Sequence, residues 1–240
     1  MEPRRRVAVL LAGGTGTRIG TVVSGGTPKQ LLEVGGRTLL EHALRTFHAH
    51  PDVDAITLVM AAGHLDAARA LVERGGYADK VIAVVPGGQT RSDSTVAALA
   101  TLPDEPCLVL VHDAARPLIS ARIISDCFEA LASYAVVNVA IETADTIVAV
   151  GTDGRVRDTL DRSLLRRVQT PQGFHSEVLR EAYALAARDP HFTATDDCGV
   201  VMRYLPDQPV VVVPGDERNL KVTTPVDLEI VAALLAADGP

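Results

Sequence analysis

Aromatic residues are scarce in this chain: tryptophan is absent, and phenylalanine and tyrosine occur four times each in 240 residues. Hydrophobic residues nevertheless make up 47 % of the sequence. A chain of this length forms a sizeable core, within one large domain or one domain with a small appendage. That core must be built mainly from valine, leucine, isoleucine and alanine.

Cysteine is also rare. The three cysteines, Cys107, Cys127 and Cys198, are odd in number and far apart in the sequence. They match neither a disulfide framework nor a zinc-binding pattern. We interpret all three as buried or incidental thiols.

Long apolar runs and an excess of positive charge are missing as well. No apolar run reaches the roughly 18 residues of a membrane span, and only about five apolar residues follow the basic N-terminus, too few for a signal peptide. The formal net charge is −7 and the pI about 5.5, which argues against nucleic acid or an anionic membrane as a partner. We expect a cytoplasmic protein whose phosphate sites are local basic pockets.

The first loop is the most informative stretch. Five apolar residues, Val7 to Leu11, are typical of a buried strand, and three glycines follow between Gly13 and Gly16. Glycine lets the backbone approach a ligand closely, so that successive N–H groups turn toward an anion. Arg18 and, after a second flexible patch, Lys29 add cations suited to phosphate oxygens. The pattern predicts a triphosphate site.

Two familiar glycine motifs do not fit this loop. A Walker loop requires Lys and Ser/Thr directly after its last glycine, whereas Gly16 is followed by Thr17 and Arg18. The dinucleotide fingerprint fails because its third glycine would fall at Ile19. The alternative to a phosphate site is an ordinary turn after a strand without a ligand. The two added cations, Arg18 and Lys29, favour the phosphate site.

Apolar periodicity predicts alternating strands and helices along most of the chain. Strands are expected at residues 55–60, 81–85, 107–111, 136–140 and 210–213, and helices at 38–47, 65–74, 94–99, 123–134, 176–187, 197–204 and 227–236. This order predicts an α/β fold: a Rossmann-like, mostly parallel sheet with helices on both faces, whose ligands bind at the carboxyl ends of the strands. The strand at 107–111 is the most uniformly apolar and is expected at the centre.

The alternation breaks after Ile141. Residues 146–150 and 156–160 flank an Asp153-Gly154 turn, a pattern typical of a β-hairpin. We therefore predict a single domain over residues 1–240 with a β-hairpin arm at about 141–165. A projecting arm and a hairpin packed on its own domain both agree with the sequence.

Polar residues follow several of the predicted strands. Arg91 and Ser94 are expected to face the pocket from a helix N-terminus, where a phosphate or base carbonyl is favoured; an ordinary cap formed by Asp93 or Ser92 is the alternative. Asp113 follows the central strand, where a carboxylate facing a triphosphate is well placed to bind magnesium.

Alternative or purely structural roles are also considered for three polar residues after the central strand and for one later segment. Asp113 as a helix cap is the alternative to a metal ligand, and Arg116 is expected to orient Asp113 if it does not bind substrate. His112 is better explained as a satisfied core histidine than as a base. Residues 195–197, Thr-Asp-Asp, are predicted to cap the following helix.

Six segments together resemble the signature of sugar-phosphate nucleotidylyltransferases. They are LAGGTGTR with PKQLLEVGGRTLLEHAL, then GGQTRSDS (87–94), VHDAARP (111–117), QTPQGF (169–174), TDD (195–197) and NLKVTTPVDL (219–228). Within that group, the chain most resembles the cytidylyltransferases that act on methylerythritol phosphate and ribitol phosphate.

The resemblance implies a set of site residues. The nucleotide, with Mg²⁺ at Asp113, would be bound by Leu11, Ala12, Gly13, Gly14, Thr15, Gly16, Thr17, Gly87, Gly88, Arg91, Ser94, Asp113 and Ala114. Arg18, Lys29 and Lys221 would be the catalytic cations. Thr146, Arg162 and Arg116 would bind the acceptor phosphate, with Arg166 and Arg167 as alternatives to Arg162. In this family the arm is exchanged between two subunits, so a homodimer is implied.

The implied reaction joins CTP and 2-C-methyl-D-erythritol 4-phosphate into CDP-methylerythritol, releasing pyrophosphate, in the non-mevalonate route to isoprenoid precursors. D-ribitol 5-phosphate is the alternative acceptor, because Val148 stands where the methylerythritol enzymes usually carry a lysine. The GGTGTR motif also favours the ribitol phosphate relatives. HDAARP and the spacing up to TPQGF lean toward methylerythritol. A regulatory module without turnover is a third alternative, disfavoured because every expected cation and Asp113 are present. A redox role is weaker still, because the dinucleotide fingerprint is absent.

Overall fold

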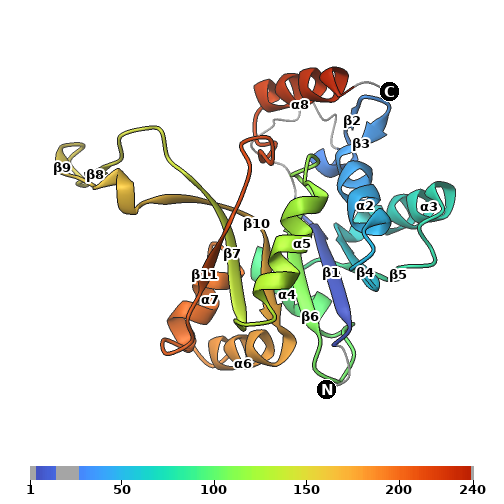
Figure 1. The fold of residues 1–240 in the computed structure, drawn as a ribbon, viewed down its shortest axis with the longest axis horizontal. Coiled ribbons are helices and arrows are strands. Elements are labelled where there is room, and N and C mark those ends of the chain that lie inside the picture. Colours follow the sequence, from blue (N-terminus) through green and yellow to red (C-terminus); the bar gives the residue numbers. More distant parts are fainter. Residues whose placement is uncertain (1–3, 15–26, 239–240) are drawn as a thin grey trace.

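A seven-stranded sheet forms the body of the protein (Figure 1). The computed structural model describes residues 4–14 and 27–238. Along the sheet the strands follow the order β11 (Val211–Pro214), β7 (Val136–Glu142), β10 (Arg166–His175), β6 (Leu108–Asp113), β1 (Arg6–Ala12), β4 (Ala55–Met60) and β5 (Val81–Pro86). The predicted central position of the 107–111 strand is confirmed, because β6 is the fourth of the seven strands.

Most neighbouring strands run parallel, which confirms the predicted fold class. The pairs β6 with β1, β1 with β4, β4 with β5, and β7 with β11 are parallel. The exception is β10, which lies antiparallel between β7 and β6. The sequence analysis predicted no strand there, since Pro171 and Gly173 are poor strand formers and the register shifts between Val168 and Gln172.

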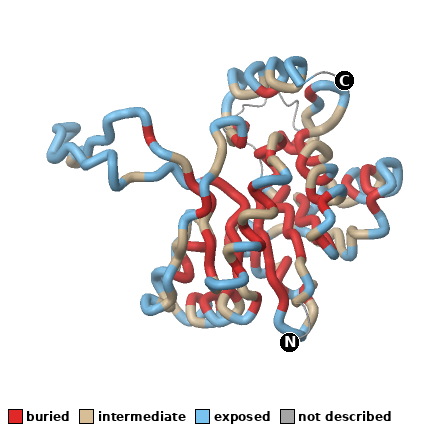
Figure 2. Tube along the Cα trace, viewed as in Figure 1, coloured by how far each residue is buried: buried red, intermediate tan, exposed pale blue. Residues whose placement is uncertain are grey.

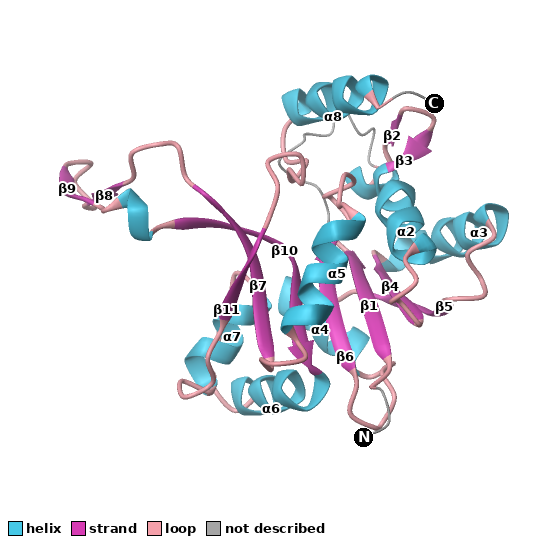
Figure 3. Cartoon of the chain, viewed as in Figure 1, coloured by secondary structure: helices cyan, strands magenta, loops and turns pink. Residues whose placement is uncertain are grey.

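Helices cover both faces of the sheet (Figure 3). One face packs against α2 (Leu39–Ala49), α3 (Leu65–Gly75) and α5 (Ala121–Ala130), and the other against α4 (Arg91–Leu99), α6 (Ser176–Ala186) and α7 (Asp197–Tyr204). Strand β1 packs against the helices on both faces. Ala8, Leu10 and Ala12 point to the first face, and the alternate residues Val7, Val9 and Leu11 point to the second. This is why its sequence is continuously apolar rather than alternating.

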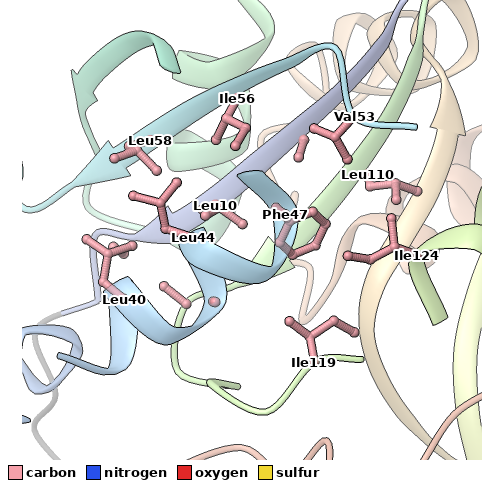
Figure 4. Packing of buried hydrophobic residues seen from close by; sticks show 14 of the residues in the cluster. Leu10, Leu40, Leu44, Phe47, Val53, Ile56, Leu58, Leu110, Ile119 and Ile124 are labelled. Carbon is pink, nitrogen blue, oxygen red and sulfur yellow. The ribbon is translucent and has the colours of Figure 1, made fainter. Parts of the chain in front are cut away.

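Aliphatic side chains build the core, as the composition predicted. Figure 4 shows Leu40, Leu44 and Phe47 of α2 beside Leu10 and Leu58 of the sheet. The predicted cap of α2 is confirmed, because the Thr38 hydroxyl accepts a hydrogen bond from the Glu41 N–H at 3.1 Å. All three cysteines are buried free thiols.

A smaller cluster holds the C-terminal helix, α8 (Pro225–Ala237), above the sheet. Val231 of α8 packs with Val34, Leu39 and Val222. The short strands β2 (Glu33–Val34) and β3 (Arg37–Thr38) form a hairpin beside it. Apolar residues lie all around α8, yet Val226 and Ile230 are exposed.

The hairpin arm projects away from the sheet (Figure 2). It consists of β8 (Val148–Val150) and β9 (Val156–Thr159), which pair antiparallel, and both strands are largely exposed. Gly154 adopts a φ of 76° in the connecting turn, a conformation that disfavours residues with a Cβ. The predicted hairpin is confirmed, and it extends from the domain instead of packing against it.

Across residues 4–14 and 27–238, none of the helices combines the length and apolar character that crossing a membrane requires.

Candidate active site

The first predicted loop begins at the carboxyl end of β1, beside the loop that follows β5. A Cβ on Gly13 would lie 3.2 Å from Ser94 Oγ, and one on Gly87 would lie 2.8 Å from the same atom. Glycine therefore fits best at both Gly87 and Gly13, because the two backbone segments and Ser94 approach so closely. Ser94 Oγ also accepts from the Gly88 N–H at 3.3 Å. The structure thus brings together Gly13, Gly87, Gly88 and Ser94 as the sequence predicted.

The cap of α4 differs in detail from the expectation. Thr90 is the N-cap, and Asp93 completes a reciprocal capping box with it. Neither Ser92 nor Asp93 is the capping residue itself. Arg91 is therefore the first helical residue, which directs its side chain toward the end of β6.

Asp113, the last residue of β6, binds two cations. Its Oδ2 accepts from Lys221 Nζ at 2.6 Å and its Oδ1 from Arg91 Nε at 3.3 Å. Burial by itself would raise the pKa of this carboxyl, but Arg91 and Lys221 hold it well below its usual range. Asp113 is therefore ionised at neutral pH and positions both cations.

Arg91 joins Asp113 to a second, fully buried carboxylate. Its Nη1 donates to Asp197 Oδ2 at 2.6 Å, and the Tyr183 hydroxyl donates to Asp197 Oδ1 at 2.6 Å. Burial and the Asp197 charge raise the pKa of Tyr183, so this phenol stays protonated. Arg91 Nη2 is buried, and no described residue accepts from it. It is thus the donor that Arg91 still offers to a ligand.

Sequence reasoning missed the role of Asp197. The Thr-Asp-Asp stretch was predicted to cap α7, and the structure divides that role: Asp196 caps the helix by accepting from Gly199 N–H, while Asp197 holds Arg91. Gln172 supports this arrangement, because its side-chain oxygen accepts from Asp197 N–H at 3.0 Å. The two adjacent acids in the sequence gave no sign of which one would cap.

The two predicted lysines are linked through the segment that carries Lys221 and Val222. Lys29 is buried and its Nζ donates to the Val222 carbonyl at 2.8 Å, next to Lys221. The Val222 N–H in turn donates to the Ala115 carbonyl at 2.8 Å, which places this segment along the end of β6. Lys29, although distant in the sequence, is therefore bound to the backbone of the residue that follows Lys221.

Leu11, Ala12, Gly14 and Ala114 also lie at this end of the sheet. The Ala114 N–H donates to the Leu11 carbonyl at 3.0 Å. A Cβ on Gly14 would lie 3.3 Å from the Gln30 amide nitrogen. Gln30 is only 3 % exposed, and its amide oxygen finds no hydrogen-bond partner among the described residues. Such an oxygen beside a glycine loop suits a ligand donor, and sequence reasoning gave Gln30 no role of its own.

Arg116 is engaged with the protein backbone. Its Nη1 donates to the Asn219 carbonyl at 2.7 Å and its Nη2 to the Val168 carbonyl at 3.3 Å. The cations that pair with Asp113 are Arg91 and Lys221, so the expectation that Arg116 orients Asp113 by pairing with it is wrong. Arg116 instead ties the loop after β6 to β10 and to the segment that carries Lys221.

His112 is a satisfied core residue, as predicted. Its Nε2 donates to the Arg116 carbonyl at 3.0 Å, and its Nδ1 lies 3.1 Å from Thr170 Oγ1. That hydroxyl oxygen accepts from the Asp113 N–H at 3.0 Å, so its own proton is free for His112. Burial lowers the pKa of His112 to about 4. A neutral, fully buried imidazole supports Asp113 from behind and is not a base.

The remaining predicted residues lie elsewhere. Thr146 and Arg162 are exposed on the arm, and Arg162 Nη1 donates to the Ala144 carbonyl at 3.1 Å. Within this chain the arm does not bring them to Asp113 (Figure 1). Arg167 pairs with Glu217, and Arg166 donates to backbone carbonyls. Thr15, Gly16, Thr17 and Arg18 lie outside the described residues. For all these residues, ligand binding stays a prediction.

Known proteins resemble the chain over nearly its whole length. The family model for 2-C-methyl-D-erythritol 4-phosphate cytidylyltransferase matches residues 6–237. A protein of that name from Thermobifida fusca is 48 % identical, over 96 % of this chain and 93 % of the relative. The bifunctional ribulose 5-phosphate reductase/CDP-ribitol pyrophosphorylase of Haemophilus influenzae is 37 % identical, over 96 % of this chain but 48 % of the relative.

Solved structures agree. The crystal structure of 4-diphosphocytidyl-2C-methyl-D-erythritol synthase from Anaerococcus prevotii superposes with a TM-score of 0.84 at 29 % identity, covering 97 % of this chain and 96 % of the other. The 2-C-methyl-D-erythritol 4-phosphate cytidylyltransferase of Thermus thermophilus gives a TM-score of 0.75 at 31 % identity, covering 95 % and 98 % of the two chains.

We expect the Asp113→Asn substitution to destabilise the protein less at acid pH than at neutral pH. The pKa of Asp113 is lower in the folded protein than its ordinary value of 3.8, so the charged form stabilises the fold. That stabilisation is complete above about pH 4 and decreases as the pH falls toward the folded pKa, by up to about 1.4 kcal/mol per pH unit.

Urea unfolding from about pH 7 to about pH 2.5 measures this difference. The gap in free energy of unfolding between wild type and Asp113→Asn should be constant above about pH 4 and narrow below it. The matched control is Asp66→Asn: this side chain is 99 % exposed in a surface pair with Arg69, so the substitution should change the free energy of unfolding little. A gap for Asp113→Asn that is constant over the whole range contradicts the prediction.

Proposed function

The chain belongs to the 2-C-methyl-D-erythritol 4-phosphate cytidylyltransferase family, and on this premise we propose that it transfers the cytidylyl group of CTP to 2-C-methyl-D-erythritol 4-phosphate. The product is CDP-methylerythritol, an intermediate of isoprenoid precursor synthesis, and pyrophosphate is released. The observation that carries the proposal is the pairing of Lys221 and Arg91 with the Asp113 carboxylate at the end of β6, together with Lys29 bound to the backbone carbonyl of Val222, the residue after Lys221.

The reaction brings two anions together, so positioning and charge neutralisation dominate the catalysis. An oxygen of the acceptor phosphate attacks the α-phosphorus of CTP and forms a new P–O bond. The bond between the α-phosphorus and the bridging oxygen breaks in line, and pyrophosphate leaves with the electron pair. No covalent enzyme intermediate is needed.

The protein groups supply fixed positive charge for this step. Lys221 is held at 2.6 Å by Asp113, and Lys29 at 2.8 Å by the adjacent backbone carbonyl of Val222. Ammonium groups anchored in this way need no reorganisation when charge develops on the phosphoryl oxygens. We assign Arg18 the same role from the sequence, and the glycine loop that begins at Gly13 the binding of the leaving phosphates.

The donor set is consistent with magnesium bound mainly by the substrate. Magnesium commonly takes one or two protein carboxylates together with substrate phosphates and water. Asp113 provides one carboxylate at the end of β6, where its oxygens accept from Lys221 and Arg91, and no group of three or more potential metal ligands occurs among the described residues. Asp113 would therefore hold Mg²⁺ that arrives with the nucleotide, where the ion would neutralise phosphate charge.

Two observations distinguish the acceptors. The relative that makes CDP-ribitol is less similar, at 37 % identity, than the methylerythritol enzyme at 48 %. Val148 instead of a lysine is one of the two sequence features that favour ribitol phosphate, and it lies on the exposed arm rather than at the Asp113 cluster. We therefore retain methylerythritol phosphate as the acceptor and ribitol phosphate as the alternative. Family membership also disfavours a regulatory module without turnover.

We propose that two copies of the chain form a homodimer through the arm. Exposed apolar side chains gather on the arm, among them Leu164 at 81 %, Val156 at 61 % and Val150 at 57 %, and such a gathering is typical of an interaction surface. In such a dimer, Thr146 and Arg162 would reach an acceptor phosphate bound by the other subunit. We also propose a cytoplasmic location with no nucleic-acid or membrane partner, in keeping with the net charge of −7.

The first experiment is pyrophosphate release by the purified protein with CTP, with and without magnesium. Methylerythritol 4-phosphate should support turnover only when magnesium is present. Ribitol 5-phosphate should support far less. Turnover with ribitol 5-phosphate alone would overturn the proposed acceptor, and Val148→Lys would then be the substitution to try. Silence with both acceptors would contradict the proposed reaction.

Lys29→Ala should lower kcat by roughly 100-fold to 1,000-fold, because a preorganised cation acts mainly on the transition state. The chain has only three lysines, and the third, Lys80, donates to the His50 carbonyl away from the site. Lys80→Ala is therefore the matched control and should keep its kcat. Steady-state kinetics separate the two roles of Lys29: a normal kcat with a raised KM would refute transition-state stabilisation.

Replacing Val156 and Leu164 by glutamate should convert the dimer into a folded monomer, because two charges would have to be buried at the interface. Light scattering measures the mass, and circular dichroism checks the fold. Met202→Glu, at a side chain that is 60 % exposed on α7, is the control and should leave the dimer intact. A monomeric wild type, or a dimeric arm variant, would rule out this assembly.

A further inference from the structure

A second cavity lies between α2, the β2–β3 hairpin and the C-terminal half of α8. Its volume is about 730 Å³, within the roughly 300–1,000 Å³ that small-molecule sites occupy. The segment Pro117–Ser120, which precedes α5, forms part of its wall. The residues that line it do not include Asp113, Lys29 or Lys221, so it is distinct from the active site.

Three arginines from separate parts of the chain line this cavity. They are Arg37 in β3, Arg45 in α2 and Arg218 in the loop before Lys221. Arg218 pairs with Asp238 at 2.6 Å, whereas Arg37 and Arg45 form no ion pair with any carboxylate in the described part of the chain. The three arginines outnumber Asp238, the one carboxylate among the lining residues, and this excess of positive charge, in a chain with a net charge of −7, is suited to an anionic ligand.

A hydroxyl donor lies on the same wall. Ser120 is the N-cap of α5, yet its side chain makes no capping hydrogen bond, and the first turn of α5 contains no acidic residue. The Ser120 Oγ is buried without a partner among the described residues. Buried hydroxyl groups are normally hydrogen-bonded, so this one, beside the free N–H groups of the first turn, suits an oxyanion.

The other lining residues include an aliphatic wall as well as the polar side chains of His42, Thr46 and Asp238. Leu118 and Ile119 lie on one side and Leu235 of α8 on the other. Leu235 also contacts the hairpin turn, since a Cβ on Gly35 would lie 3.2 Å from its Cδ1. An inorganic anion would leave these side chains uncovered, whereas an anion with an aliphatic chain would cover them.

We propose that this cavity, with Arg37, Arg45, Arg218 and Ser120 beside an aliphatic wall, binds an alkyl diphosphate. The diphosphate lies among the arginines, and its charge exceeds what one guanidinium balances. The alkyl chain lies against Leu118 and Leu235. The ligand is thus an amphiphilic diphosphate, distinct in chemistry from both the nucleotide and the sugar phosphate of the active site.

Isothermal titration of the full-length protein with octyl diphosphate tests the proposal. Saturating CTP and magnesium are present throughout, so that the nucleotide site is filled. Wild type should bind one octyl diphosphate under these conditions. The Arg37→Gln/Arg45→Gln variant should bind it about tenfold more weakly or worse, because charge-assisted hydrogen bonds are lost.

A second arginine pair provides the matched control. Arg69 and Arg74 lie exposed on α3, away from the cavity, so Arg69→Gln/Arg74→Gln should bind octyl diphosphate like wild type. Turnover of Arg37→Gln/Arg45→Gln with CTP and acceptor shows that this variant is folded. Inorganic pyrophosphate should bind the cavity more weakly than octyl diphosphate, since it covers none of the aliphatic wall.

Three results would overturn the proposal. The first is loss of octyl diphosphate binding when CTP is present, which would place the ligand in the nucleotide site. The second is equal affinity of wild type and Arg37→Gln/Arg45→Gln. The third is pyrophosphate binding as tight as that of octyl diphosphate, which would remove the role of the apolar wall.

Discussion

The ionised carboxylate of Asp113 is the constraint on which the active site depends. Burial would neutralise it, and Lys221 and Arg91 keep it charged. Removing one partner of such a buried pair costs about 3–5 kcal/mol, although replacing the whole cluster by apolar residues is often neutral or stabilising. Stability alone therefore does not explain these charges. Their arrangement makes sense for a protein that must hold two phosphorylated reactants close together, because each cation is fixed before the anions arrive.

A layer of polar groups behind Asp113 holds this arrangement in place, and β10 supplies much of it. Thr170 bonds both the Asp113 N–H and His112, and the Val168 carbonyl accepts from Arg116. Gln172 holds the backbone of Asp197, which in turn holds Arg91. The strand runs antiparallel to its neighbours, so that its middle residues lie beside the end of β6. The QTPQGF segment thus supports the site and explains why a polar strand occupies an interior position in the sheet.

The periphery of the molecule follows a different pattern. Core strands bury nearly every apolar side chain, whereas the arm and α8 leave large apolar residues such as Leu164 and Val226 in contact with solvent. In the described part of the chain, neither element contributes to the two main clusters that cover the sheet. The exposed apolar side chains of the arm support the proposed contact with a second copy of the chain, and the C-terminal half of α8 lines the cavity through Leu235.

The sequence by itself determined the fold class, most element positions and the satisfied histidine His112. These features depend on local signals such as apolar periodicity, glycine positions and polar residues that follow strands. The sequence also predicted Lys29 and Asp113 as site residues and, through the family resemblance, Lys221. Only the tertiary structure decided which groups meet. In the folded protein Arg91 pairs with Asp113 and Asp197, and Arg116 donates to backbone carbonyls. Strand β10 lies antiparallel inside the sheet. The physical reason is that a charged side chain pairs with whichever opposite charge folding brings near it. For Arg91 with Asp197 and for Lys221 with Asp113, the partners are 106 and 108 residues apart in the sequence, so the residues next to each charge do not predict the pair.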